Sequence, residues 1–132
     1  MWSIRPAKPA ALLDEIRSPH LKVTMDPANL FHAGELPRMT EILDEAFALV
    51  GKDIVLRHTR DLDHDGQAGH KPAGHGVLDY DRYMSLLRKY QFKGPILLHG
   101  LTPEQVPGCL TFLRAKLTAA LQEKPCRVEN AA

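Results

Sequence analysis

The feature that most constrains this chain is the alternation of short strand-like segments with longer amphipathic segments. Strand character occurs at residues 21–25, 54–58 and 95–99, and helical patterns occur at residues 9–17, 36–50, 79–90 and 103–121. Strands that alternate with helices pair in parallel through right-handed crossovers. The sequence therefore predicts one α/β domain over residues 1–132 with the order α-β-α-β-α-β-α.

The helix predicted at residues 36–50 has the clearest apolar stripe, with side chains at spacings of three and four: Met39, Leu43, Ala46, Phe47 and Val50. Gly51 follows it, where a left-handed cap residue is expected. Asp79 is expected to cap the next helix, and the last helix has a leucine stripe: Leu110, Leu113, Leu117 and Leu121. A polar, glycine-rich loop is predicted at residues 59–76, and a frayed tail at residues 125–132.

Charge and composition exclude several classes of partner. The chain has 17 basic and 16 acidic residues, which gives no electrostatic reason to bind nucleic acid or an anionic membrane. Residues 1–10 have no apolar signal-peptide core, and no apolar run approaches the roughly 20 residues of a membrane span. Cys109 and Cys126 show no metal-binding spacing. We expect Cys109 to be a buried free thiol and the protein to be cytoplasmic.

Polar residues stand at the carboxyl ends of all three predicted strands. Asp26 follows the first strand, His58 ends the second and His99 ends the third. In parallel α/β folds that edge is where ligands bind. Each residue alone could instead cap backbone amides. Together, one carboxylate and two imidazoles suit Mn²⁺, Zn²⁺ or Fe²⁺, so we expect the three to bind one divalent cation.

A second arrangement of possible metal ligands lies in the polar loop. Asp61, Asp63, Asp65 and Gly66 match the first half of an EF-hand loop. The twelfth position, which should be a bidentate glutamate, is Pro72. This mismatch argues against a Ca²⁺ site, although the same loop has three histidines that could take up Zn²⁺ adventitiously: His64, His70 and His75.

Four segments resemble motifs of one protein family. They are SPHLKVTMDPANL at residues 18–30, IVLRHTRD at 54–61, PAGHGVLD at 72–79 and FKGPILLH at 92–99. In this order and spacing they are similar to the xylose isomerase-like sugar phosphate isomerase/epimerase family, over about residues 9 to 120. The resemblance implies a partial (β/α)₈ TIM barrel, namely its last three parallel strands with four helices.

The resemblance also implies site residues. Family members hold one divalent metal with two glutamates, an aspartate and a histidine; Asp26 matches the aspartate and His58 the histidine. The first glutamate belongs to an upstream strand, which we expect residues 1–132 to lack. His99 stands in place of the second glutamate and is expected to be both a metal ligand and a catalytic residue. The residues expected to bind substrate are Asn29, Asp61 and Lys71.

The function implied by the resemblance is isomerisation or epimerisation of a sugar or sugar phosphate. A base removes a proton next to a carbonyl, and a divalent metal, expected to be Mn²⁺, Zn²⁺ or Mg²⁺, stabilises the enediolate. Without the two glutamates, the chain is expected to be incomplete as an enzyme. The alternative is a non-catalytic metal- or sugar-binding module, in which a second copy covers the unpaired edges of a three-stranded sheet.

Overall fold

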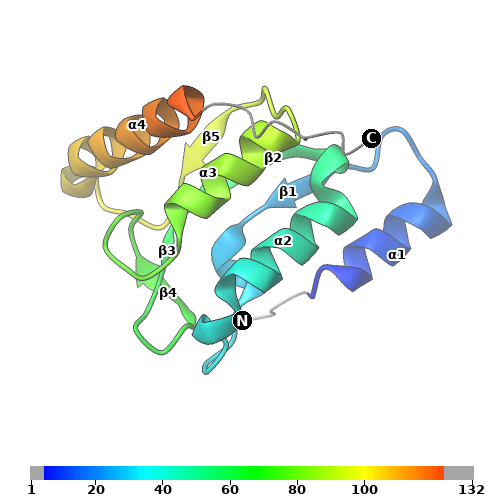
Figure 1. The fold of residues 1–132 in the computed structure, drawn as a ribbon, viewed down its shortest axis with the longest axis horizontal. Coiled ribbons are helices and arrows are strands. Elements are labelled where there is room, and N and C mark those ends of the chain that lie inside the picture. The colour runs from blue at the N-terminus through cyan, green and yellow to red at the C-terminus, as the bar shows by residue number, and fades with distance from the viewer. Residues whose placement is uncertain (1–4, 124–132) are drawn as a thin grey trace, which may run out of the picture.

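The computed structural model describes residues 5–123, and within them a parallel three-stranded sheet is flanked by four α-helices (Figure 1). The sheet has the strand order β1-β2-β5, and β3 and β4 form a separate antiparallel hairpin. This confirms the predicted α/β class and the three parallel strands. In chain order the helices and strands are α1 (Ala7–Ile16), β1 (Val23–Met25), α2 (Met39–Val50), β2 (Ile54–Thr59), β3 (Asp61–Leu62), β4 (Ala68–Lys71), α3 (Tyr80–Lys89), β5 (Ile96–Leu98) and α4 (Val106–Gln122).

The strand register decides which side chains share a face of the sheet. Thr24 of β1 lies opposite Leu56 of β2, and His58 of β2 lies opposite Leu97 of β5. Side chains alternate along a strand, and paired residues of neighbouring strands point the same way. These four side chains therefore lie on one face of the sheet.

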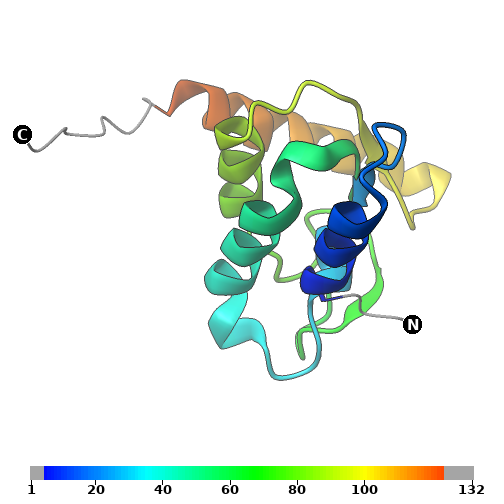
Figure 2. The same ribbon diagram turned by 90° about the vertical axis from the view of Figure 1, so that its right-hand side faces the viewer.

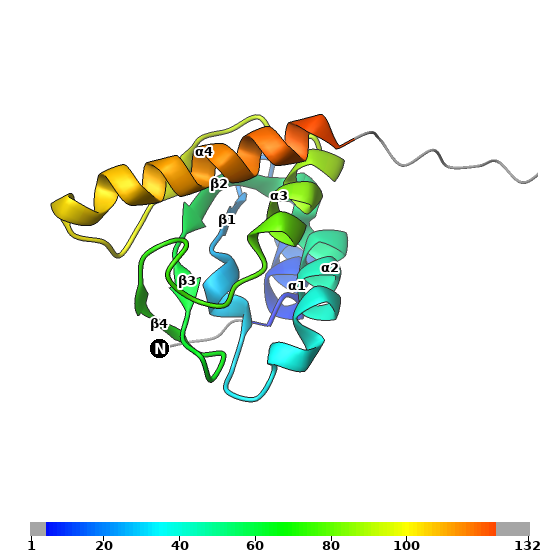
Figure 3. The same cartoon turned by 60° about the vertical axis from the view of Figure 1, so that its left-hand side comes forward.

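The two faces of the sheet differ in what covers them. Helices α1, α2 and α3 lie together on one side of the strands (Figure 3). On that side Met25 and Thr59 are 4% and 0% exposed. On the other side Thr24 is exposed and Leu97 is 43% exposed. The sheet thus has a helix-covered face and an open face, and only the covered face contributes to the core.

The core is centred on aromatic rings between α2 and α3. Phe47 is fully buried, and its ring lies 6.0 Å from that of Tyr83 and 5.7 Å from that of Tyr90. The predicted α2 stripe is confirmed, because α2 buries Leu43, Ala46, Phe47 and Val50 together with Ile42. Asp79 caps α3 as expected, since its side chain accepts a hydrogen bond from the Arg82 amide.

Gly51 differs from its prediction. Its φ of −56° is right-handed, so it is not a left-handed cap. A β-carbon built at this position would lie 2.7 Å from the Tyr90 ring. The glycine is therefore required by the close approach of that ring to the end of α2, and not by backbone conformation.

The segment predicted as a loop at residues 59–76 contains the β3–β4 hairpin, so that prediction was wrong in part. The Asp63 amide donates to the Gln67 carbonyl, and Gly66 takes a φ of 93° in the turn between the strands. Backbone hydrogen bonds pair these polar residues without an apolar alternation, which is why the sequence pattern does not reveal the strands.

Helix α4 buries a different stripe from the one predicted. Leu113 is buried and Leu117 is partly buried, but Leu110 and Leu121 are 36% and 74% exposed. The buried side chains in α4 are Cys109, Leu113 and Ala120. Helix α4 packs on α3, where Arg88 Nη1 donates to the Ala120 carbonyl.

Helix α1 lies beside α2 (Figure 2) and buries none of its residues. Leu12 and Ile16, one turn apart, are about half exposed. No helix in residues 5–123 is long and apolar enough to cross a membrane. Cys109 is a buried free thiol, as expected, whereas Cys126 and the predicted tail at 125–132 lie outside the described residues.

Candidate metal site at the carboxyl ends of the strands

The three predicted metal ligands meet at the carboxyl edge of the sheet. Asp26 directly follows β1, His58 lies in β2 and His99 directly follows β5. Because these strands are neighbours and run parallel, their ends converge. One potential ligand atom from each of the three side chains lies within 4.8 Å of the others.

The two histidines are stacked on each other. Their ring centroids are 4.9 Å apart and their planes differ by 3°. The His99 amide donates to the Thr59 carbonyl at 3.2 Å, which extends the β2–β5 ladder by one residue and fixes the backbone beneath the ring. His58 is half-buried and His99 is exposed, so the pair opens toward solvent on the His99 side.

Asp26 is held by two hydrogen bonds that orient its carboxylate. Oδ1 accepts from the Ala28 amide at 3.2 Å, because Asp26 caps a short 3-10 helix at Pro27–Leu30. Oδ2 accepts from Arg60 Nε at 2.8 Å. A carboxylate oxygen has two lone pairs, so each oxygen keeps one for a further partner.

Arg60 is the site residue that sequence reasoning missed. It is 8% exposed and donates from its other guanidinium nitrogen, Nη2, to Asn29 Oδ1. The Tyr80 hydroxyl donates to the Arg60 carbonyl at 2.7 Å, which anchors the backbone. Strand alternation could not have found it, because β2 ends at Thr59 and Arg60 lies in the turn that follows.

The donor set fits a divalent metal ion. One carboxylate oxygen and two imidazole nitrogens are ligands of Mn²⁺, Zn²⁺ and Fe²⁺. With metal–ligand bonds of roughly 2.0–2.2 Å, two ligand atoms of one ion lie at most about 4.4 Å apart. The three ligand atoms lie within 4.8 Å of one another, so they would have to approach slightly to hold one ion.

Asn29 and Lys71, both predicted to contact substrate, lie in different parts of the structure. Asn29 is next to Asp26 through their shared partner Arg60. Lys71 lies in β4, and its Nζ is 3.7 Å from Asp63 Oδ1 in the same hairpin. The structure therefore brings Asn29 to the candidate site, whereas Lys71 pairs within the hairpin.

Asp61 is buried beneath the hairpin, with 1% of its surface exposed. Oδ1 accepts from the amides of Leu62 and Leu78, and Oδ2 accepts from the Gly74 amide, all at 2.9 Å. This geometry ties the segment before α3 to the end of β2. It supports a structural role for Asp61, and its predicted contact with substrate has no support in these contacts.

The EF-hand-like loop shows no gathered ligand set. Among the described side chains, Asp26, His58 and His99 form the group of three that a single ion could bridge. Asp65 Oδ1 accepts from the Gln67 amide, and Asp63 faces Lys71. The loop carboxylates thus serve the hairpin turn, as the missing glutamate at Pro72 suggests.

Buried ionisable groups pack behind the site on the covered face. Burial raises the pKa of the Tyr80 and Tyr83 phenols, so both stay protonated donors, and Tyr83 donates to the His58 carbonyl at 3.4 Å. Burial lowers the pKa of Arg57 to about 10. The Arg57 guanidinium lies 3.5 Å from the centroid of the Phe92 ring and donates to the Gly94 carbonyl.

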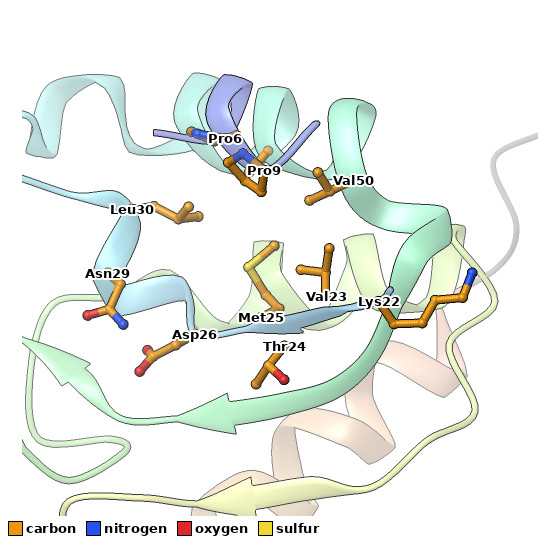
Figure 4. Close-up of a pocket in the computed structure, with 11 residues that line it drawn as sticks. Pro6, Pro9, Lys22, Val23, Thr24, Met25, Asp26, Asn29, Leu30 and Val50 are labelled. Carbon is orange, nitrogen blue, oxygen red and sulfur yellow. The ribbon is translucent and has the colours of Figure 1, made fainter. Parts of the chain in front are cut away.

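A cavity of about 270 Å³ lies between α1 and β1, with Asp26 and Asn29 in its wall. Figure 4 shows Val23 and Met25 pointing toward Pro9 and Val50, while Thr24 points the opposite way. The cavity thus has an apolar body on the helix side of β1. Its polar end adjoins the candidate metal site.

One comparison with known proteins agrees with the arrangement of the strands. The model of the xylose isomerase-like TIM barrel family matches residues 3–115. No curated protein matches the sequence. The family match covers all three parallel strands, the hairpin and most of α4. The chain therefore belongs to the xylose isomerase-like TIM barrel family.

Proposed function

We propose that this chain holds a divalent metal ion through Asp26, His58 and His99 and acts in the isomerisation or epimerisation of a sugar or sugar phosphate. The observation that carries the proposal is the convergence of these three side chains, with ligand atoms within 4.8 Å, at the carboxyl edge of the sheet. Membership of the xylose isomerase-like TIM barrel family supports the reaction class.

The reaction removes a proton next to a carbonyl. A bound divalent ion supplies Lewis-acid stabilisation of the negative charge that develops on the substrate oxygens. Asp26 and His58 hold the ion, and Arg60 fixes the orientation of Asp26. His99 is the exposed member of the group, so it is either the third ligand or the group that exchanges a proton with substrate.

Calorimetric titration with Mn²⁺ and Zn²⁺ tests the metal site. We expect Asp26→Ala and His58→Ala each to weaken binding at least tenfold, because each removes one of three protein ligands. His75→Ala, which removes an exposed histidine of the loop, is the matched control and should bind like the wild type. Equal affinity in the wild type and in both site variants would exclude this metal site.

Self-association is a second candidate, favoured by the open face of the sheet. Within residues 5–123, β1 and β5 each have an unpaired edge, and Leu97 is 43% exposed on the open face. A second copy could pair with these edges and cover this face. Light scattering measures whether the chain forms a discrete dimer. A dimer that binds metal but shows no isomerase activity would support a binding module.

A further inference from the structure

Arg60 brings a positive charge directly to the proposed metal ligands. Its Nε is 2.8 Å from Asp26 Oδ2, and each side chain is 9% exposed. Burial limits screening by water and salt, so the two charges largely cancel. An imidazole must be uncharged to bind a metal ion, so when His58 and His99 act as ligands these four side chains together offset none of the charge of the cation.

This arrangement penalises a metal ion that binds alone. An ion at about 2 Å from an Asp26 oxygen lies roughly 5 Å from the guanidinium, because Arg60 is 2.8 Å from the same carboxylate. Two cations at that separation repel each other, and even with water-like screening the repulsion amounts to about tenfold in affinity. An anion bound to the metal offsets this penalty, since both cations attract it.

The coordination of the ion also leaves room for such an anion. Asp26, His58 and His99 supply three ligands, whereas Mn²⁺ and Zn²⁺ take four or more. The His99 side is exposed, so a ligand can reach the ion across the open face of the sheet. A guanidinium matches the planar geometry of oxyanions and pairs with them strongly.

We propose that Arg60 makes metal binding at the Asp26–His58–His99 site conditional on an oxyanion co-ligand, supplied by the phosphate or carboxylate group of the substrate. This inference rests on the proposed metal site. It narrows the substrate class from sugars in general to acidic sugar derivatives. If Arg60 acted only by holding Asp26 and Asn29 in position, its removal would weaken metal binding instead of strengthening it.

The test measures free Mn²⁺ by electron paramagnetic resonance in the presence of the full chain, with and without inorganic phosphate at constant ionic strength. We expect phosphate to tighten Mn²⁺ binding by the wild type at least fivefold. Arg60→Gln should bind Mn²⁺ alone at least threefold more tightly than the wild type and should lose the phosphate effect. Weaker Mn²⁺ binding by Arg60→Gln, or an equal phosphate effect in both proteins, would overturn the proposal.

Two variants guard against other causes. Arg60→Lys keeps the charge, so it should bind Mn²⁺ alone within twofold of the wild type even if Arg60→Gln fails to fold by circular dichroism. Arg82→Gln removes an equal charge from the Arg82–Asp44 pair, which lies between α3 and α2. It should leave the affinity for Mn²⁺ unchanged, both with and without phosphate. Departure of either variant from these results would count against Arg60 acting through its charge at this site.

To identify the chemical class of the oxyanion, the same assay compares acetate, inorganic phosphate, glucose 6-phosphate and glucose. Tightening by acetate identifies a carboxylate, and tightening by the two phosphate compounds identifies a phosphate. Tightening by none of the anions, or by glucose as strongly as by glucose 6-phosphate, refutes an oxyanion co-ligand. Failure of the metal site itself is distinguishable, because His58→Ala would then bind Mn²⁺ as the wild type does.

Discussion

Replacement of Asp61 by alanine tests whether this residue holds the fold together. Its carboxylate accepts three backbone amide hydrogen bonds, from Leu62, Gly74 and Leu78. In the Asp61→Ala variant these amides lose their acceptor. Water can reach the exposed Gly74, but Leu62 and Leu78 are buried and remain without a partner.

The expected cost follows from the two buried donors. A buried backbone amide without an acceptor costs about 1–3 kcal/mol, and removal of the desolvated carboxylate returns part of that loss. We expect Asp61→Ala to lower the free energy of unfolding by about 3 kcal/mol. A domain of 132 residues has a total stability of roughly 7–20 kcal/mol, so the variant folds but loses a large share of its stability.

Urea denaturation followed by circular dichroism measures this loss. With a urea dependence of about 1–3 kcal/mol per M, the midpoint should fall by about 1–3 M. Asp61→Asn keeps one carbonyl oxygen and should lose about half as much. Asp63→Ala is the matched control from the same hairpin, since its 43%-exposed side chain forms only a surface ion pair, worth about 0–1 kcal/mol. A loss below 1 kcal/mol for Asp61→Ala would refute the structural role.

Two further predictions concern packing and pH. Gly51→Ala should lower the free energy of unfolding by about 1–3 kcal/mol through overpacking against the Tyr90 ring, and the loss measured in urea should largely vanish in a Tyr90→Ala background. Because burial raises the pKa of Tyr80 and Tyr83, their folded state keeps protons that the unfolded chain loses above about pH 10. The contribution of these phenols to stability is present below that pH and is lost as the pH rises. In a pH titration followed by absorbance at 295 nm, the phenolates of Tyr80 and Tyr83 should therefore appear only when the protein unfolds. Ionisation of both tyrosines in the folded protein would contradict this.

Local periodicity predicts most of the fold for a physical reason. The α2 stripe and the three strands are buried on one side, so apolar spacing records them directly. The hairpin at β3 and β4 leaves no such record, because backbone hydrogen bonds and the Asp61 carboxylate stabilise it. The apolar stripe predicted for α4 was wrong in part, because Leu113 and Leu117 face the core whereas Leu110 and Leu121, at the two ends of the stripe, are exposed.

The candidate site is predictable to the same extent. Strand ends converge in every parallel sheet, so the positions of Asp26, His58 and His99 follow from the strand order alone. The charge of the site does not follow from the strand order. The pairing of Arg60 with Asp26 depends on how the chain turns after β2, and there the Tyr80 hydroxyl holds the Arg60 carbonyl.

The two faces of the sheet determine how a ligand reaches this site. On the helix-covered face Met25 and Thr59 are buried, and the cavity between α1 and β1 reaches Asp26 and Asn29 from that side. The open face carries Thr24, Leu56 and Leu97, and His99 is exposed there, so we expect the proposed substrate to approach across it. A second copy that covered that face would also border the proposed metal site. Groups that complete the proposed metal coordination and shield the proposed reaction from water would then come from that copy.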